Sequence, residues 1–185
     1  MAAKILCLIV LLLECRALYI SFYARKWLIL LFYTQISSII AALSAFFLLL
    51  LGQPQWVTVL RYLSTCMLVF TFLVTVFVLV PLEGNPRRLL WSGTGLYQHV
   101  LCPILSTVSY VLAENHAGSN WIWLPVALTL VYGLALVSLV GLRLVEPPYP
   151  FLRVHEQPPL NTVLWILLLL AVIGALSAGV CWIAK

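Results

Sequence analysis

The chain has 185 residues, of which 64% are hydrophobic and only 8% are charged, and its mean hydropathy is +1.14. Globular proteins are on average about half apolar and about a quarter charged, so this composition excludes an ordinary soluble domain. The net charge of +5 comes from basic residues that are scattered over short segments. A scattered distribution argues against nucleic acid as a partner and indicates loops that set the topology of a membrane protein.

Six apolar segments follow one another along the chain. A helix crosses the hydrocarbon core of a bilayer with about 20 residues, and segments of about this length occupy residues 5–23, 27–51, 57–81, 89–113, 120–143 and 160–184. Residues 146–159 form the longest break and hold five of the ten prolines, so they cannot continue a helix. We therefore predict an all-α fold in which residues 1–185 form a single transmembrane domain, a bundle of six helices.

The charges near the segment ends predict how the bundle is oriented. The run after Lys4 resembles a signal peptide, but residues 14–17 offer no small-x-small cleavage pattern, so we favour a retained helix. Six basic residues follow the first, third and fifth segments, and three lie on the opposite side: Arg25, Lys26, Arg87, Arg88, Arg143 and Arg153 against Lys4, Arg61 and Lys185. Because basic loops stay in the cytoplasm, the odd-numbered loops are predicted to be cytoplasmic and both termini to be outside.

The sequence lacks the common signatures of metal and cofactor sites. The five cysteines lie inside apolar runs without a Cys-x-x-Cys pair. No phosphate-binding glycine motif and no His-Glu-x-x-His pair is present. We therefore expect neither a metal site nor a cofactor.

Four polar residues inside the apolar segments share a depth in the predicted bundle. Thr34 lies about seven residues into the second segment and His99 about ten into the fourth, or roughly 10 to 15 Å below the odd-loop surface. Glu14 and Arg16 precede the end of the first segment at Tyr23 by nine and seven residues. A polar group in the bilayer needs a partner or a cavity, so this layer is the candidate functional site.

Thr34 and His99 are candidates for a nucleophile and its general base, because an imidazole can take the proton of a nearby hydroxyl. A structural alternative exists for each. Thr34 can bond the carbonyl of its own helix four residues back, and His99 can bond a neighbouring helix. Glu14 and Arg16 face different sides of their helix. They are candidates for orienting the imidazole or binding a head group, but they can equally make separate ion pairs, and Arg16 can snorkel.

Small and hydroxyl residues elsewhere are interpreted mainly as packing residues. Ser37, Ser38 and Ser44 give the second segment a small-residue face that suits close helix packing, and a substrate contact by Ser38 is the alternative. Thr71 and Thr75 repeat at a spacing of four residues in the third segment. This repeat indicates packing rather than a ligand site.

Three short motifs, in order, resemble the bacterial Pr6Pr family of membrane proteins. Residues 32–38 (FYTQISS) resemble its Phe-Thr-x-x-Ser-Asn signature, with Ser38 where the family usually has Asn. Residues 97–103 (YQHVLCP) resemble its His and following Pro. Residues 148–152 (PYPFL) resemble its Tyr-Pro-Phe-Leu loop, with Arg153 where an acidic residue commonly follows.

The Pr6Pr group is distantly similar to the androgen-induced and androgen-dependent membrane proteins, six-helix threonine hydrolases that cleave fatty acid esters of hydroxy fatty acids. The resemblance implies an intramembrane lipid-ester hydrolase of the bacterial inner membrane, with Thr34 as nucleophile and His99 as base. Its partner would be a membrane lipid or lipid ester. The alternatives are a small transporter or channel, in which the polar layer is a translocation site, and a non-enzymatic structural protein.

Overall fold

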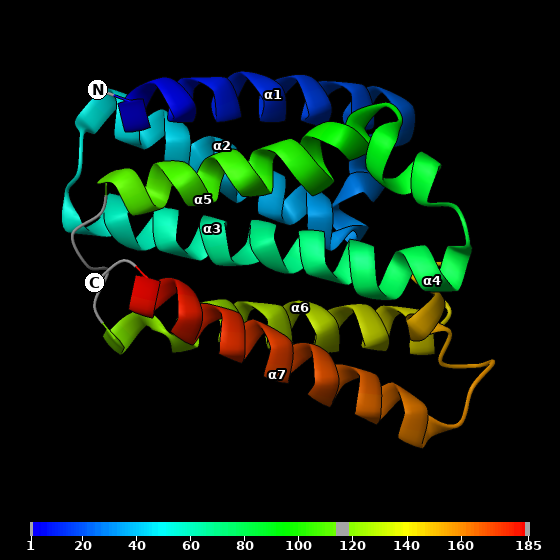
Figure 1. The fold of residues 1–185 in the computed structure, drawn as a ribbon. Coiled ribbons are helices and arrows are strands. Elements are labelled where there is room, and N and C mark those ends of the chain that lie inside the picture. The colour runs from blue at the N-terminus through cyan, green and yellow to red at the C-terminus, as the bar shows by residue number, and fades with distance from the viewer. Residues whose placement is uncertain (1, 114–118, 184–185) are drawn as a thin grey trace.

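The computed structural model describes residues 2–113 and 119–183. Within these residues six helices are long and apolar enough to cross a membrane, which confirms the predicted all-α six-helix architecture (Figure 1). The main helices are α1 (Ala2–Arg25), α2 (Tyr33–Leu51), α3 (Gln55–Val74), α5 (Cys102–Ala113), α6 (Trp123–Gly141) and α7 (Pro159–Ile183). The shorter pieces are η1 (Lys26–Leu31), η2 (Thr75–Leu79), α4 (Val80–Glu83), η3 (Arg87–Trp91), η4 (Leu96–Leu101), η5 (Ser119–Trp121) and η6 (Pro150–Leu152).

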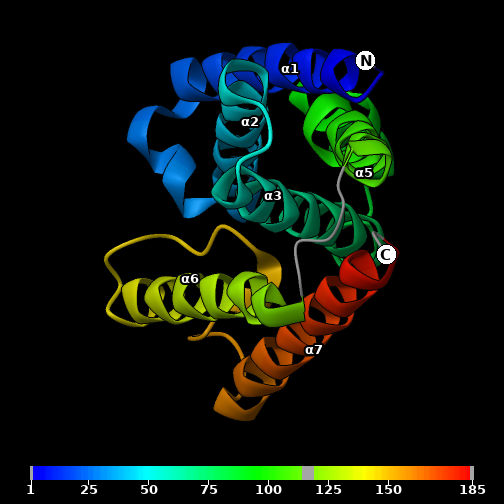
Figure 2. The ribbon, with the colours of Figure 1, turned by 90° about the vertical axis from the view of Figure 1, so that its left-hand side faces the viewer.

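The helices form two groups that meet at α3. Helices α1, α2, α3 and α5 pack around one another as a ring, because α1 and α3 each contact both α2 and α5. Helices α6 and α7 form a pair that packs against α3 (Figure 2). A polar interior inside the ring is therefore separated by α3 from the largely apolar contact with α6 and α7.

The small-residue face of α2 packs as predicted. Ser37, Ser38 and Ser44 are all buried, and the Ser44 hydroxyl lies 3.0 Å from the Ser64 hydroxyl of α3. Small side chains let two helix backbones approach closely, so hydroxyl groups on facing helices come within hydrogen-bond reach. This close contact fixes α2 against α3 and thereby the position of the N-terminus of α2.

Two π-helical segments interrupt the third and fourth spans, and each is followed, one residue later, by a proline. The N–H of Val80 bonds the Thr75 carbonyl at the end of η2, and the N–H of Cys102 bonds the Tyr97 carbonyl at the end of η4. Pro81 and Pro103 come next and have no N–H to donate to the carbonyl four residues back. Wider i→i+5 turns accommodate this loss, and such turns are frequent at functional sites.

The predicted boundaries of two segments are wrong. The segment predicted at 27–51 divides at Phe32, which has an extended backbone with φ −104° and ψ 122°, into η1 and α2. The segment predicted at 89–113 spans only Leu96–Ala113, because η3 and a turn precede it. Both errors place Thr34 and His99 nearer to helix ends than expected. Residue 184, the last of the sixth predicted segment, and Lys185 lie outside the described residues.

The connections after the first, third and fifth spans lie at one end of the bundle (Figure 1). Single-cysteine variants on a cysteine-free background therefore give a direct topology test. Arg87→Cys and Arg153→Cys should react with a membrane-impermeant maleimide from the cytoplasmic side, and Gln53→Cys from the outside. Reaction of Arg87→Cys and Gln53→Cys from one common side would contradict the six-span topology.

Candidate functional site

A polar cleft opens at the end of the bundle where the odd-numbered connections meet. Its volume is about 1010 Å³, and its walls come from α1, η1, α2, η3, η4 and the connection after α6. Thr34 and His99 both line this cleft, together with Gln35 and Gln98. Arg25 and Arg88 lie in its walls as well. The cleft thus brings the two predicted catalytic residues to one space.

The Thr34 hydroxyl differs from that of other threonines in the bundle. Four threonines donate their hydroxyl proton to the carbonyl four residues earlier: Thr71, Thr75, Thr107 and Thr129. Thr34 is the second residue of α2, and the preceding chain is broken at Phe32. Within the described residues its hydroxyl makes no such bond to Leu30, so the structural alternative for Thr34 does not apply. The hydroxyl is left available for chemistry.

The phenol of Tyr149 is a polar group beside Thr34. The Tyr33 N–H, one of the free donors at the start of α2, donates to Tyr149 Oη at 2.8 Å, and the phenol also neighbours Thr34. The ring is held by stacking on Phe151, with centroids 5.2 Å apart and planes 3° apart. Burial raises the pKa of Tyr149, so the phenol stays protonated and keeps a donor beside Thr34.

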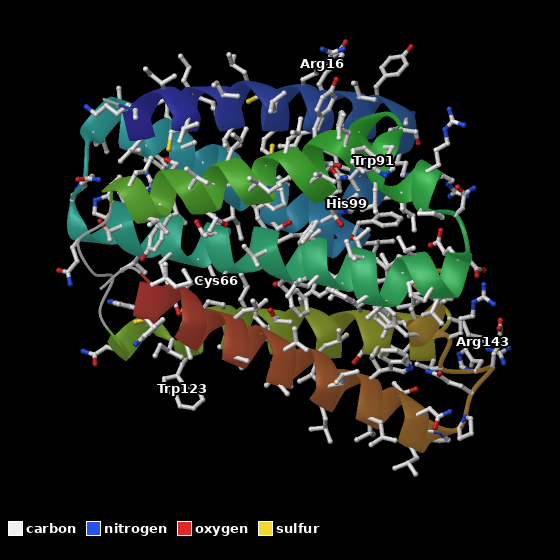
Figure 3. The ribbon with its side chains drawn as sticks, viewed as in Figure 1. Arg16, Cys66, Trp91, His99, Trp123 and Arg143 are labelled. Carbon is white, nitrogen blue, oxygen red and sulfur yellow. The ribbon has the colours of Figure 1, made fainter. Side chains whose placement is uncertain are left out.

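His99 is oriented by Thr75 rather than by Thr34. His99 Nδ1 lies 3.0 Å from Thr75 Oγ1, and Thr75 donates its only hydroxyl proton to the Thr71 carbonyl at 2.8 Å. Nδ1 must then carry the proton that it donates to Thr75, which leaves Nε2 as the unprotonated nitrogen. No hydrogen bond joins His99 to Thr34 in the described part of the chain. The side chain lies between η4 and α3 (Figure 3).

A separate apolar pocket lies between α2 and α3 on one side and α6 and α7 on the other. Its volume is about 70 Å³, and Phe70, Leu130 and Leu169 are among its walls. Thr34 and Tyr149 line this pocket as well as the cleft. Thr34 therefore stands where a polar space and an apolar space meet.

Glu14 and Ser38 lie deeper in the ring than the cleft. Glu14 is completely buried beside the Ser38 hydroxyl and the Cys102 thiol. Ser38 accepts a hydrogen bond of 3.0 Å from Gln98 Nε2. Neither Glu14 nor Ser38 lines the cleft, so the geometry does not give them direct contact with a bound substrate.

Arg16 does not belong to the buried layer. Its side chain is exposed, points away from the bundle (Figure 3), and places its guanidinium carbon 5.7 Å from the centroid of the Tyr97 ring. The structure therefore does not bring Arg16 together with Thr34 and His99 in the cleft. Arginine stems commonly lie along apolar surface with the charge directed toward an interface, which was the alternative for this residue.

The structure gives two residues of this site a role that the sequence does not predict for them. Thr75 was expected only to pack, and it does bond its own helix, but it also bonds His99. Tyr149 belongs to the PYPFL motif but had no assigned role. Only the resemblance of residues 148–152 to the Pr6Pr loop motif draws attention to Tyr149, since nothing in the spacing from residue 34 to residue 149 indicates contact.

Comparison with protein-family models, with curated proteins and with solved structures finds no match to this chain. The geometry of the cleft, the pocket and their shared residues therefore carries the functional argument.

Proposed function

We propose that this chain is an intramembrane hydrolase of lipid carboxylic esters, with Thr34 as nucleophile and His99 as general base. One observation carries the proposal: the hydroxyl of Thr34 has no back-bond to its own helix and lies at the junction of the polar cleft and the apolar pocket. The carbonyl of a lipid ester is polar and the chains beside it are apolar, so such a substrate would use both the cleft and the pocket. The resemblance of residues 32–38 and 97–103 to Pr6Pr motifs supports the same two residues.

The proposed reaction follows from the roles of three side chains. Thr34 Oγ1 attacks the ester carbonyl while His99 Nε2 accepts its proton, and the protonated imidazole then returns a proton to the leaving alkoxide. The Tyr149 phenol, which neighbours Thr34, donates a hydrogen bond to the oxyanion that develops on the carbonyl oxygen. Water from the cleft then hydrolyses the acyl-threonine and returns the enzyme to its starting state.

Two arginines in the cleft offer contacts for an acidic head group, although the carboxylates of Glu83 and Glu146 line the same space. Arg25 and Arg88 both line it, and the Arg25 guanidinium carbon lies 4.5 Å from the centroid of the Phe32 ring. A guanidinium held in this way is available for a carboxylate. The free carboxylate of a fatty acid ester of a hydroxy fatty acid would meet the two arginines, and the first methylene groups of an acyl chain would enter the apolar pocket.

The transporter alternative has less support from the same geometry. A translocation path has to be polar or wet from one face to the other. Beyond Glu14, Ala41, Leu68 and Cys102 form a buried apolar cluster with Leu13 across the ring. This cluster interrupts the polar interior, so the cleft ends inside the bundle.

The direct test is a purified preparation in detergent with a series of long-chain fatty acid esters. Release of free fatty acid, with labelling by an alkyl fluorophosphonate that is lost in Thr34→Ala, is the expected result. A preparation that retains its fold but neither cleaves any ester nor reacts with the probe would overturn the proposal.

Filling the apolar pocket should change selectivity for acyl chains. Gly133 lines the pocket, and a Cβ built there meets no heavy atom within 4 Å, so Gly133→Phe introduces bulk without a backbone clash. We expect at least about tenfold loss of kcat/KM for long acyl chains, the equivalent of a few lost methylene contacts, and a smaller loss for acetyl esters.

Gly141→Phe is the matched control for this experiment. Gly141 belongs to the same helix, is exposed and does not line the pocket. Its variant should keep the wild-type chain-length profile. An equal loss for acetyl and long-chain esters in Gly133→Phe would show that the pocket does not hold the acyl chain.

A further inference from the structure

Glu14 is the acidic side chain at the centre of the ring formed by α1, α2, α3 and α5. Its exposed fraction is 0%, and within the described residues neither carboxyl oxygen has a hydrogen-bond partner of good geometry. No basic side chain in this described part pairs with it. An ionised carboxylate that is buried without a counter-charge is far less stable than a neutral carboxyl group, so the geometry favours Glu14 with its proton bound.

The groups around Glu14 offer hydrogen-bond contacts but no compensating charge. The elements that pack against α1 are η1, α2, η4 and α5, and their titratable groups are Lys26, Tyr33, Tyr97, His99, Cys102 and Tyr110. Of these only the Cys102 thiol acts on Glu14, and the remaining contact is the Ser38 hydroxyl. Arg16, on the same helix, lies on the exposed side. The carboxyl group therefore has neutral neighbours.

A row of polar side chains leads from this carboxyl group to the cleft. Gln98 Nε2 donates to Ser38 Oγ at 3.0 Å. Gln35 and Gln98 donate to each other's side-chain oxygens at 3.0 and 3.2 Å, and both line the cleft. A serine hydroxyl rotates freely and both donates and accepts. Ser38 can therefore exchange hydrogen bonds between Glu14 and the amide groups at the cleft wall.

The opposite side of Glu14 is closed. Ala41 lies on α2 one turn beyond Ser38, and it packs with Leu68, Cys102 and Leu13. Apart from the Cys102 thiol, these side chains carry no polar atom that could extend the row of polar groups beyond Glu14. Buried hydroxyls such as Ser44 and Ser64 lie farther along the ring, beyond this cluster, so the cleft side is the more direct route of exchange with water.

From this arrangement we infer that Glu14 is a proton-binding site inside the membrane, which exchanges its proton with water of the cleft by way of the Ser38 hydroxyl, while the Gln35–Gln98 pair holds that hydroxyl toward the cleft wall. The site does not depend on ester cleavage. It needs only the buried carboxyl group, the serine and the cleft, so it also stands if the proposed hydrolase activity is absent.

Infrared spectroscopy of the full chain in lipid vesicles tests the protonation directly. The wild-type protein should show the C=O stretch of a neutral carboxyl group at neutral pH. Glu14→Gln, which is nearly isosteric, should lose this band, whereas Glu83→Gln, at the exposed end of α4, should keep it. A wild-type spectrum without the band, or a band that survives in Glu14→Gln, would overturn the inference.

A hydrophobic carbodiimide gives a second readout that does not depend on the spectrum of a variant. The carboxyl proton moves to a carbodiimide nitrogen, the carboxyl oxygen adds to the central carbon, and an O-to-N acyl shift leaves a stable N-acylurea with no leaving group. Dicyclohexylcarbodiimide should modify Glu14 in the wild-type protein at neutral pH, as mapped by peptide mass spectrometry. Modification of other glutamates with Glu14 left unmodified would contradict a protonated Glu14.

The route of exchange is tested by the deuterium shift of the same band. In deuterated buffer the C=O band of the wild-type protein should shift as the proton is replaced. Ser38→Ala breaks the link to Gln98 and should slow this shift at least about tenfold, while Ser44→Ala, on the same helix but bonded to Ser64, should leave the rate unchanged. Equal rates in Ser38→Ala and the wild-type protein would exclude the cleft as the route.

Discussion

Thr34→Ala is expected to abolish lipid-ester cleavage, and His99→Ala is expected to lower kcat by about 10²- to 10⁴-fold. The alanine at position 34 removes the atom that forms the acyl bond. Loss of the imidazole leaves a hydroxyl of very high pKa without an acceptor for its proton. Because both residues act in one step, the double variant should be little worse than the worse single variant. Initial rates with purified protein in detergent give these comparisons.

Two further substitutions separate a chemical from a packing role for Thr34. Thr34→Ser keeps a hydroxyl at nearly the same place and should retain part of the activity. Thr34→Val keeps the shape and should be as inactive as Thr34→Ala. Thr129 supplies a matched control, because it also lines the apolar pocket but donates to the Pro125 carbonyl, and Thr129→Val should retain activity. Equal rates in the Ser, Val and Ala variants at position 34 would make Thr34 a packing residue.

Tyr149→Phe is expected to lower kcat by about 10²- to 10³-fold, the loss typical of one missing oxyanion donor. The phenylalanine keeps the stack on Phe151 but removes the hydroxyl that neighbours Thr34. It also leaves the Tyr33 N–H without its acceptor, which should cost roughly 1 kcal/mol of stability. The pH dependence of kcat for the wild-type enzyme, the variant's kcat and its thermal unfolding in detergent measure these effects together.

Tyr132→Phe is the control for this variant. The Tyr132 hydroxyl lies near the Tyr149 phenol but donates to the Leu31 carbonyl at 2.7 Å. Its loss should lower stability by a similar amount and leave kcat within a few-fold of the wild-type value. Equal losses of kcat in the two variants would mean that the phenols act only by holding η1 and α2 in place.

Because burial raises the pKa of Tyr149, wild-type activity should not fall from ionisation of this phenol until the solution pH exceeds the ordinary tyrosine range.

The number of spans could be predicted from the sequence because the bilayer thickness fixes the length of an apolar helix. Which side chains meet across the bundle could not be predicted in the same way. Thr34 was placed in the body of a helix, where a back-bond is the ordinary state, yet the break at Phe32 moves it to the first turn of α2. That break has no strong sequence signal, since residues 27–31 are as apolar as the helices on either side.

The predicted polar layer is only partly formed in the structure, and the reason is again physical. Residue depth was inferred from counts along straight α-helices, which gave Thr34 and His99 a common layer, and the structure places both in the walls of the cleft. Depth alone carries no information about direction around the helix axis. Glu14 therefore lies inside the ring and Arg16, two residues later, outside it. The role of Thr75 was missed because its back-bond gives a sufficient account of a threonine in a membrane helix, although that bond leaves a lone pair for His99.

The two prolines that follow η2 and η4 also set the angular register of the helices on which the site is built. A π turn contains one residue more than an α turn, which rotates the chain before it by about 100° relative to the chain after it. His99 and Thr75 lie within these turns, so a helical wheel drawn through the whole third or fourth span places the cleft-side residues on the wrong side of the helix. Replacing Pro81 or Pro103 by alanine restores the missing N–H and lets an α turn re-form. The imidazole would then swing away from Thr75 although neither His99 nor Thr75 has been replaced. The orientation of the base therefore depends on two prolines that take no part in its chemistry.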